Sequence, residues 1–428
     1  MLNIIADNPP ATFVIGEGAP DAALSPEDLR AVVASALDGV PPGARVLAII
    51  PDKTRDDNTA LLLPFAAQIL AQRGAAKLDA LIAQGTHAPM SDAEKRAKSG
   101  AGAGPPLLGQ VFDHQWNRPD ELTTIGTLSA ARVAAITGGL LNDAVPLTVN
   151  RLLTPGLYDT VLLFGGTMPH EVAGYAGGAK YFFPGVSGPE LTHATHWLGA
   201  LAGVEQTIGR VETPTRHLIE AAAEHIKAQV IAFVSVCTRS DKLQTHALFA
   251  GDYRLALRRA AEISSHVHIR YTGRKYKRVL ALLDEHYDEM WTGGKASYRL
   301  GPIIEEGGEL VIYAPHLRCL SDTHGPLIER YGYAPLETVQ AMMAHSPELQ
   351  DNRCVAAHLA HVAFASRRAE QGRILPRYNI KLASQISANV CRRVNLGYLD
   401  YQTFRRADYE NDADTLIVEN AGRDLYLP

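Results

Sequence analysis

The sequence predicts an α/β protein with two α/β domains built on mainly parallel sheets. Apolar runs typical of buried strands alternate with segments whose apolar residues recur at helical spacing, first in residues 45–100 and again from residue 278. The chain has 428 residues, more than one hydrophobic core usually organises. We predict an N-terminal domain over residues 1–270 and a C-terminal domain over residues 276–405, with residues 406–428 packing back on the first.

The elements of the first domain follow from local patterns. Strands over residues 45–50 and 78–83 flank a helix over residues 59–73, which makes a βαβ unit. Ser91 and Glu94 have capping-box spacing, so a helix is expected from there to near Gly100. The other predictions for this domain are a strand at 12–15, a helix at 26–37, a loop at 101–110, a strand at 160–164, helices at 188–202, 214–227 and 252–264, and a strand at 229–236.

A basic, polar stretch at 265–276 marks the predicted boundary before a second βα series. Strands are expected at 278–283 and 309–314, with a helix-like stretch between them that Gly307 and Gly308 end. Residues 323–400 have mostly helical patterns, with a short strand at 379–382, and a last strand is expected at 414–418.

Composition and charge exclude several classes of protein. A hydrophobic fraction of 46% and a charged fraction of 20% favour a folded chain over a disordered one. The net charge of −5 and the lack of a long basic run argue against nucleic-acid binding. The four cysteines are scattered without a CxxC pair, and no apolar run approaches the roughly 20 residues of a membrane span. We expect a cytoplasmic protein.

Charged residues follow two strands of the predicted βαβ unit. Asp52, Lys53 and Arg55 come after the first strand, and His87 comes after the second. Ligands of open parallel sheets bind at this carboxyl edge, so these side chains are candidates for a site. For Lys53, a surface charge at the start of a helix is the simpler interpretation.

The stretch from Gly165 to Gly185 is dense in glycine. Paired glycines, Gly177 and Gly178, precede Lys180, an arrangement that suits an anion such as a phosphate. A GGxK tetrapeptide by itself is a weak signal, and single histidines are more often packed than functional. Here His170, His193 and His196 surround the loop, which strengthens the functional interpretation.

A second lysine, Lys295, follows two glycines ahead of a predicted helix in the other domain. A lysine loop in each α/β unit predicts an active site in the interdomain cleft.

With these motifs the chain resembles the lactate racemase family of nickel-pincer-nucleotide enzymes, which are racemases and epimerases of α-hydroxy acids. The resemblance runs from the strand at 45–50 to the glycines at 307–308. It rests on four blocks in order, namely Asp52-Lys-Thr-Arg55, Gly85-Thr-His87-Ala-Pro89, Pro169-His170 through Gly177-Gly178-Ala-Lys180 to Pro184-Gly185, and His196, sixteen residues after Lys180.

The resemblance implies a cofactor site. Lys180 would carry the nickel-pincer nucleotide covalently, as a thioamide to a thiolated pyridinium mononucleotide. His196 would be the protein ligand of the nickel. Gly177 and Gly178 would lie near the nucleotide phosphate, and Asp52 would help to order the cofactor and Arg55. The enzymes that build this cofactor would be transient partners.

The resemblance also implies the chemistry. The hydrogen on carbon 2 of a hydroxy acid is too weakly acidic for easy removal as a proton, so the family oxidises the alcohol by reversible hydride transfer. His87 and His170 would exchange the hydroxyl proton, one for each enantiomer. Arg55 would hold the substrate carboxylate together with Lys295.

The chain departs from the lactate enzyme around the substrate. Trp291 and Thr292 stand where that enzyme has a Tyr-Gln pair, and its C-terminal tryptophan has no counterpart. In the region where that tryptophan would stand, the chain has Asn352 and Arg353, with His324 and His358 on either side. Asn352 and Arg353 are either substrate contacts or surface helix residues. A larger or more polar substrate, such as a sugar acid, is therefore expected, with lactate or a short aliphatic hydroxy acid as the alternative.

Two other classes remain open on the residues alone. One is a zinc-dependent hydrolase or lyase with His170, His193 and His196 as ligands and Glu171 as base. It gives no role to Lys180 or His87. The other is a non-catalytic protein that binds a nucleotide or another anion.

Overall fold

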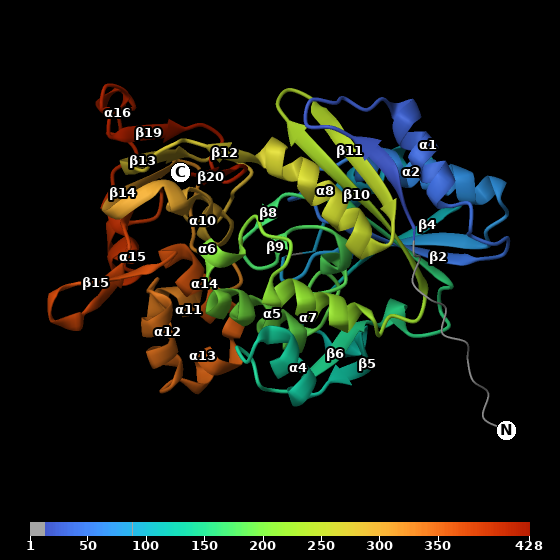
Figure 1. The fold of residues 1–428 in the computed structure, drawn as a ribbon, viewed down its shortest axis with the longest axis horizontal. Coiled ribbons are helices and arrows are strands. Elements are labelled where there is room, and N and C mark those ends of the chain that lie inside the picture. Colours follow the sequence, from blue (N-terminus) through green and yellow to red (C-terminus); the bar gives the residue numbers. More distant parts are fainter. Residues whose placement is uncertain (1–12, 88) are drawn as a thin grey trace. The chain divides into compact units, whose positions relative to one another are not determined.

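The computed structural model describes residues 13–87 and 89–428, which fold into two compact units (Figure 1). The first unit comprises the chain up to Met168, Ala173–Thr195 and Val211–Val267. The second comprises Pro169–Val172, His196–Arg210 and His268–Pro428. The predicted continuous domain over residues 1–270 differs from this division, because two short segments before residue 211 pack with the second unit.

The elements of the first unit agree with most of the predicted ones. Its strands are β1 (Val14–Gly18), β2 (Arg45–Pro51), β3 (Lys77–Ala83), β4 (Leu108–Asp113), β5 (Leu122–Leu128), β6 (Val145–Asn150), β7 (Thr160–Gly166), β9 (Gly174–Tyr175), β10 (Gln229–Arg239) and β11 (Leu243–Gly251). Its helices are α1 (Pro26–Ala36), α2 (Thr59–Gln72), α3 (Asp92–Ser99), α4 (Ala130–Thr137), α7 (Pro214–Ala223) and α8 (Tyr253–His268), with 3-10 turns η1 (Ala101–Ala103), η2 (Pro119–Glu121), η3 (Arg151–Leu153) and η4 (Gly178–Tyr181). Helix α5 (Pro189–Ala202) begins in this unit and continues into the second.

Within the described chain, the main sheet of the first unit has the order β1-β11-β10-β7-β2-β3-β4. Strands β10, β7, β2, β3 and β4 pair in parallel, whereas β1 and β11 pair antiparallel at one edge. Helices α1 and α2 lie side by side and cover one face of this sheet (Figure 1). Apolar side chains at alternate positions of β2, such as Val46 and Ile50, pack against them.

The second unit is a smaller α/β structure. Its strands are β8 (Pro169–His170), β12 (Ile269–Tyr271), β13 (Tyr276–Leu282), β14 (Ile304–Ala314), β15 (Ser366–Arg368), β16 (Ile374–Pro376), β17 (Asn379–Ser384), β18 (Gly397–Leu399), β19 (Thr415–Val418) and β20 (Leu425–Leu427). Its helices are α6 (Val204–Thr207), α9 (Met290–Gly293), α10 (Lys295–Leu300), α11 (Gly325–Tyr331), α12 (Leu336–Met343), α13 (Pro347–Asp351), α14 (Arg353–Ala363), α15 (Ala388–Arg393) and α16 (Ala407–Glu410), with 3-10 turns η5 (Gly301–Ile303) and η6 (Glu370–Gly372).

The described residues of the second unit form a parallel sheet in the order β18-β17-β14-β13-β19. The predicted last strand is present as β19. It pairs with β13, and β20 pairs with β12, so the chain end belongs to the second unit, whereas the prediction associated it with the first. The α/β fold with mainly parallel sheets is thus confirmed.

Two predicted segments were wrong in detail. The helix-like stretch expected to reach residue 306 ends earlier, because β14 already begins at Ile304. Gly307, with φ +78, lies where the register between β13 and β14 shifts, so the glycines accommodate an irregular strand pairing instead of ending a helix. The loop expected at 101–110 contains η1 and the start of β4.

The residues that the structure describes include no helix that is long and apolar enough to cross a membrane.

Helix α3 provides a test of local packing. It begins at the predicted capping box of Ser91 and Glu94 and ends at Gly100, whose φ is +67. A Cβ at Gly100 would lie 2.3 Å from the Ala60 carbonyl oxygen of α2, whereas a Cβ at Gly104, with φ +62, would meet nothing within 4 Å. We expect Gly104→Ala to lower the free energy of unfolding by about 1 kcal/mol, for the strain in φ alone.

Gly100→Ala should cost clearly more than Gly104→Ala, because helices α2 and α3 must separate to admit the methyl group. Urea denaturation of both variants measures the difference. Equal costs would show that the contact between α2 and α3 yields easily.

Candidate active site

The carboxyl ends of β2 and β3 place two predicted site residues at one edge of the first sheet. The strands are parallel neighbours, with Pro51 opposite Ala83, so the loops that follow them leave from the same edge. Asp52 is the first residue after β2, and His87 lies four residues beyond β3. The sequence predicted this common edge, and the structure confirms it.

The carboxylate of Asp52 contacts the imidazole of His87 directly. Asp52 Oδ2 lies 2.6 Å from His87 Nδ1. The other oxygen, Oδ1, accepts hydrogen bonds from the backbone N–H and the hydroxyl of Thr54, at 2.9 and 2.6 Å. The prediction for Asp52 named Arg55 and a cofactor as its partners; the contact with His87 was missed.

The charge state of Asp52 fixes the tautomer of His87. Asp52 is 4% exposed, and burial by itself would raise the pKa of its carboxyl group. The His87 imidazole, Arg55 and the Thr54 hydroxyl outweigh burial, so the pKa of Asp52 lies well below its usual range. An ionised carboxylate can only accept, so the proton of neutral His87 lies on Nδ1, and Nε2 is the proton acceptor of the ring.

The loop that carries Arg55 is tied down by a buried ion pair. The ammonium of Lys98, on α3, donates to Asp57 Oδ2 at 2.7 Å and to the backbone carbonyl of Arg55 at 2.8 Å. The Asp57 side chain is fully buried and also accepts the N–H of Thr59 at the start of α2. Lys53, in contrast, is exposed and pairs with Glu94, which agrees with the surface-charge interpretation.

Lys180 lies in the turn η4, and its side chain is half-buried. Gly177 and Gly178 before it have φ values of +96 and +60. A Cβ at Gly177 would lie 2.6 Å from Thr167 Oγ1, and one at Gly178 would lie 3.0 Å from the Tyr253 carbonyl oxygen. Backbone conformation and close packing therefore already require these glycines. Their predicted proximity to a phosphate stays a prediction.

A buried arginine that the sequence analysis missed holds this glycine loop. Arg216, on α7, is fully buried and donates to the backbone carbonyls of Ala173, Tyr175 and Gly177. Burial lowers the pKa of Arg216 to about 10, so the guanidinium remains charged at neutral pH. No local sequence pattern marks Arg216, because its partners are backbone atoms about 40 residues earlier.

The other predicted site residues belong to the second unit: His170, His196, Trp291, Thr292 and Lys295. His170 is 7% exposed, and the backbone N–H of Val172 donates to its Nδ1 at 3.1 Å. His196 and Lys295 are half-buried, the latter at the start of α10.

Trp291 packs against two histidines of its own unit. The ring centroids of His324 and His358 lie 4.4 and 4.2 Å from that of Trp291. Burial, together with His361, His324 and His196, holds the pKa of His358 well below its usual value, so this ring is neutral at pH 7. Trp291 therefore packs against at least one uncharged imidazole, that of His358.

Two residues considered as substrate contacts already have local partners. The Thr292 hydroxyl donates to the Glu289 carbonyl at 3.0 Å. The Asn352 side chain donates to the Glu348 carbonyl at 2.9 Å, where it joins α13 to α14. Local helix geometry accounts for both.

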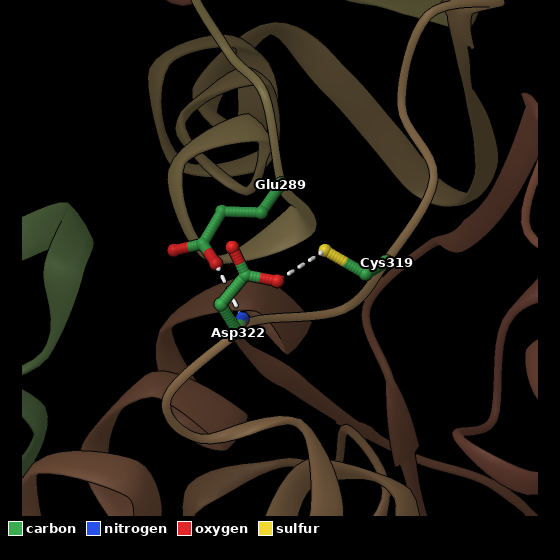
Figure 2. Close-up of side chains that lie close together, drawn as sticks. All are labelled: Glu289, Cys319 and Asp322. Atoms are coloured by element: carbon green, nitrogen blue, oxygen red, sulfur yellow. Dashed lines mark hydrogen bonds between the residues drawn. The ribbon is translucent and has the colours of Figure 1, made fainter. Parts of the chain in front are cut away.

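One cluster in the second unit has the composition of a metal site. Figure 2 shows Glu289, Cys319 and Asp322, whose ligand atoms lie within 4.8 Å of one another. The Asp322 N–H donates to Glu289 Oε2 at 2.8 Å, and the Cys319 thiol donates to Asp322 Oδ1 at 3.5 Å. Burial and the neighbouring carboxylates raise the pKa of Cys319 to about 11, so the thiol stays protonated. These hydrogen bonds explain why the three residues lie together: they hold the loop at 319–322 in place.

The third histidine of the zinc alternative, His193, belongs to the first unit, and its ring contacts Trp116 edge-on at 5.9 Å.

Comparison with known proteins supports the resemblance. Residues 29–209 match the family model of the lactate racemase N-terminal domain. A crystal structure of a Thermotoga maritima protein from a structural genomics programme is 31% identical over 96% of this chain and 99% of that one, with a TM-score of 0.87. The lactate racemase apoprotein from Thermoanaerobacterium thermosaccharolyticum has the same fold, with a TM-score of 0.69 and 17% identity over 94% and 93% of the two chains. No curated protein matches the chain.

The depressed pKa of Asp52 predicts a pH dependence of stability. Its carboxylate contributes stability above the unfolded pKa of about 3.9, and this contribution disappears as the pH falls toward the lower pKa of the folded state. We expect the difference in unfolding free energy between wild type and Asp52→Asn to fall as the pH is lowered below the unfolded pKa of Asp52. It should shrink by about 1.4 kcal/mol per pH unit below about pH 4.

Urea denaturation between about pH 3 and about pH 7 measures this difference. The same series in a His87→Gln background is the control, because there Asp52 has lost the imidazole that most lowers its pKa. A difference that does not change with pH in the wild-type background would contradict an ionised Asp52.

The role of Arg216 is tested by Arg216→Met. The variant removes the Arg216 hydrogen bonds from three backbone carbonyls, so we expect a loss of roughly 3 kcal/mol in unfolding free energy. The reactivity of Lys180 toward an amine reagent, read by peptide mass spectrometry, should also change. Arg132→Met, on the exposed face of α4, is the matched control. Unchanged stability and reactivity would remove Arg216 from the support of the loop.

Proposed function

The chain belongs to the lactate racemase family, and we propose that it is a racemase or epimerase of a 2-hydroxy acid. The observation that carries the proposal is the match of residues 29–209 to the lactate racemase N-terminal domain. This segment contains His87, His170, Lys180 and His196, the residues on which the resemblance rests.

The geometry of His87 supports a role as general base. Its Nε2 is the acceptor of the ring, because Nδ1 donates to Asp52. Asp52 also stabilises the imidazolium that forms when Nε2 takes the substrate's hydroxyl proton. His170 would serve the opposite enantiomer, since inversion requires a proton acceptor on each face. Arg55, whose guanidinium can form two parallel hydrogen bonds, would hold the carboxylate with Lys295.

The residues present fit the cofactor of the family. Covalent attachment requires an accessible amine, and nickel ligation requires an accessible imidazole; the side chains of Lys180 and His196 are both half-buried. Lys180 would hold the nickel-pincer nucleotide and His196 would ligate its nickel. When bound, this group supplies the reversible oxidation and reduction of the substrate at carbon 2. The enzymes that build the cofactor would be the transient partners of the protein.

A substrate more polar than lactate, such as a sugar acid, suits the second unit better than a short aliphatic acid. The rings around Trp291 are imidazoles, and neutral imidazoles can donate to and accept from hydroxyl groups. Because His358 is neutral, this surface favours additional hydroxyls over a second carboxylate.

The test begins with the protein produced together with the cofactor-building enzymes. Intact mass and peptide mapping should locate an adduct on Lys180, and metal analysis should find nickel. We expect the loaded protein to interconvert the C2 epimers of a polyhydroxy acid faster than those of lactate, as measured by chiral chromatography. His87→Gln should lower kcat by roughly 100-fold or more, the usual contribution of a general base.

Lys180→Ala is the control for the adduct, and Lys53→Ala, an exposed lysine of the same unit, is the matched control for a change of charge. A loaded protein that epimerises none of the hydroxy acids, or a Lys180 that stays unmodified beside the cofactor-building enzymes, would reject the proposal.

A further inference from the structure

The second unit contains a buried carboxylate that the proposed function does not use. The side chain of Glu171 is 12% exposed, and its Oε2 lies 3.6 Å from Nδ1 of the neighbouring His170. No hydrogen-bond donor among the described residues reaches this oxygen. A buried carboxylate with an unsatisfied oxygen is costly, so its presence calls for a physical reason.

Cationic groups of the same unit keep Glu171 ionised. Burial alone would raise the pKa of this carboxyl group, but Lys295, a hydrogen bond from the backbone N–H of Glu171 and the charge of Arg299 outweigh it, and the net shift is downward. Arg299 is itself fixed, because it donates to the carbonyls of Pro169, at 2.9 Å, and Arg423. The carboxylate thus lies beside His170 as a permanent negative charge.

To act as a base at Nε2, His170 needs a hydrogen-bond acceptor for a proton on Nδ1, and Glu171 can be that acceptor. The Val172 N–H donates to Nδ1, so in this arrangement the proton of neutral His170 is on Nε2. A ring in that tautomer cannot accept a hydroxyl proton at Nε2. To act as a base there, His170 must carry its proton on Nδ1, and the Val172 N–H cannot accept it. Glu171 Oε2 is an acceptor close to that atom.

We propose that Glu171 is the positioning residue of His170. When the ring carries a proton at Nδ1, this atom no longer accepts the Val172 N–H and instead donates to the Glu171 carboxylate. This inference rests on the proposed function of His170. This exchange is a change of tautomer. The neutral ring gives up its proton on Nε2 to water and takes up a proton from water on Nδ1, so the number of protons on the ring stays the same. In the base step, the substrate O–H bond breaks, an N–H bond forms at Nε2, and Glu171 stays ionised and stabilises the imidazolium.

The two acid–base histidines would then differ in how they are held. His87 has a standing contact with Asp52 at 2.6 Å, whereas His170 reaches its carboxylate only in the protonated or Nδ1–H form. The groups that face Glu171 are His170 from its own segment, Lys295, Tyr298 and Arg299 from α10, and His361 from α14. Burial lowers the pKa of His361 to about 4, so near neutral pH Lys295 and Arg299 are the permanent positive charges among them.

The experiment is an NMR titration of the histidine rings in full-length protein labelled with ¹⁵N-histidine, with no cofactor required. His170→Gln assigns the signals of His170. We expect Glu171→Gln to move the His170 titration to lower pH by roughly one unit, because a nearby negative charge is lost. The nitrogen shifts should also show less of the Nδ1–H form. Glu337→Gln is the control for loss of a carboxylate of the same unit, since Glu337 is an exposed carboxylate on α12 that accepts the Ser366 hydroxyl.

A second variant, Glu171→Asp, keeps the charge but draws the carboxylate back by one methylene group, so it should give a smaller shift in the same direction. It also supplies the measurement if Glu171→Gln does not fold. An unchanged His170 titration in either folded variant would overturn the inference. The result is independent of the proposed function, because a shift without any racemase activity would leave the contact between Glu171 and His170 intact and reject only the reaction.

Discussion

The contact between the Asp52 carboxylate and the His87 imidazole is the interaction on which the site in the first unit depends. It exists because two parallel strands end side by side, so that residues 35 positions apart reach one another across a sheet edge. A buried carboxylate is stable there only because the imidazole, Arg55 and Thr54 compensate its desolvation. The same compensation selects the tautomer of His87, so a stability requirement and a chemical function are met by one contact.

Buried charge recurs as the means by which both units fix irregular segments. Lys98 and Asp57 hold the loop after β2, and Arg216 holds the backbone ahead of Lys180. In the second unit, Arg299 binds the carbonyl of Pro169, next to His170. Loops that carry functional groups lack the regular hydrogen bonds of helices and strands, so their carbonyls need other donors. Arginine suits this task because its several N–H groups can serve more than one carbonyl.

The chain alternates between the two units within residues 168–211. Residues 169–172 and 196–210 belong to the second unit, although the segments before and after them belong to the first. His170 and Lys180 are ten positions apart, and His193 and His196 are three apart on one helix, yet each pair is divided between the units. Sequence spacing therefore does not indicate which neighbours surround each of these side chains.

Patterns in the sequence were enough to predict the α/β class, most strands and helices, the capping box of α3 and the common edge that carries Asp52 and His87. These follow from hydrophobic periodicity and local hydrogen bonding, which short segments contain in full. Four features could be seen only in the folded chain: Asp52 pairs with His87, Arg216 binds the glycine loop, Glu171 lies among cations, and β19 completes the second sheet. Each of these depends on desolvation and on partners distant in the chain, and burial in three dimensions sets the energy of a charge.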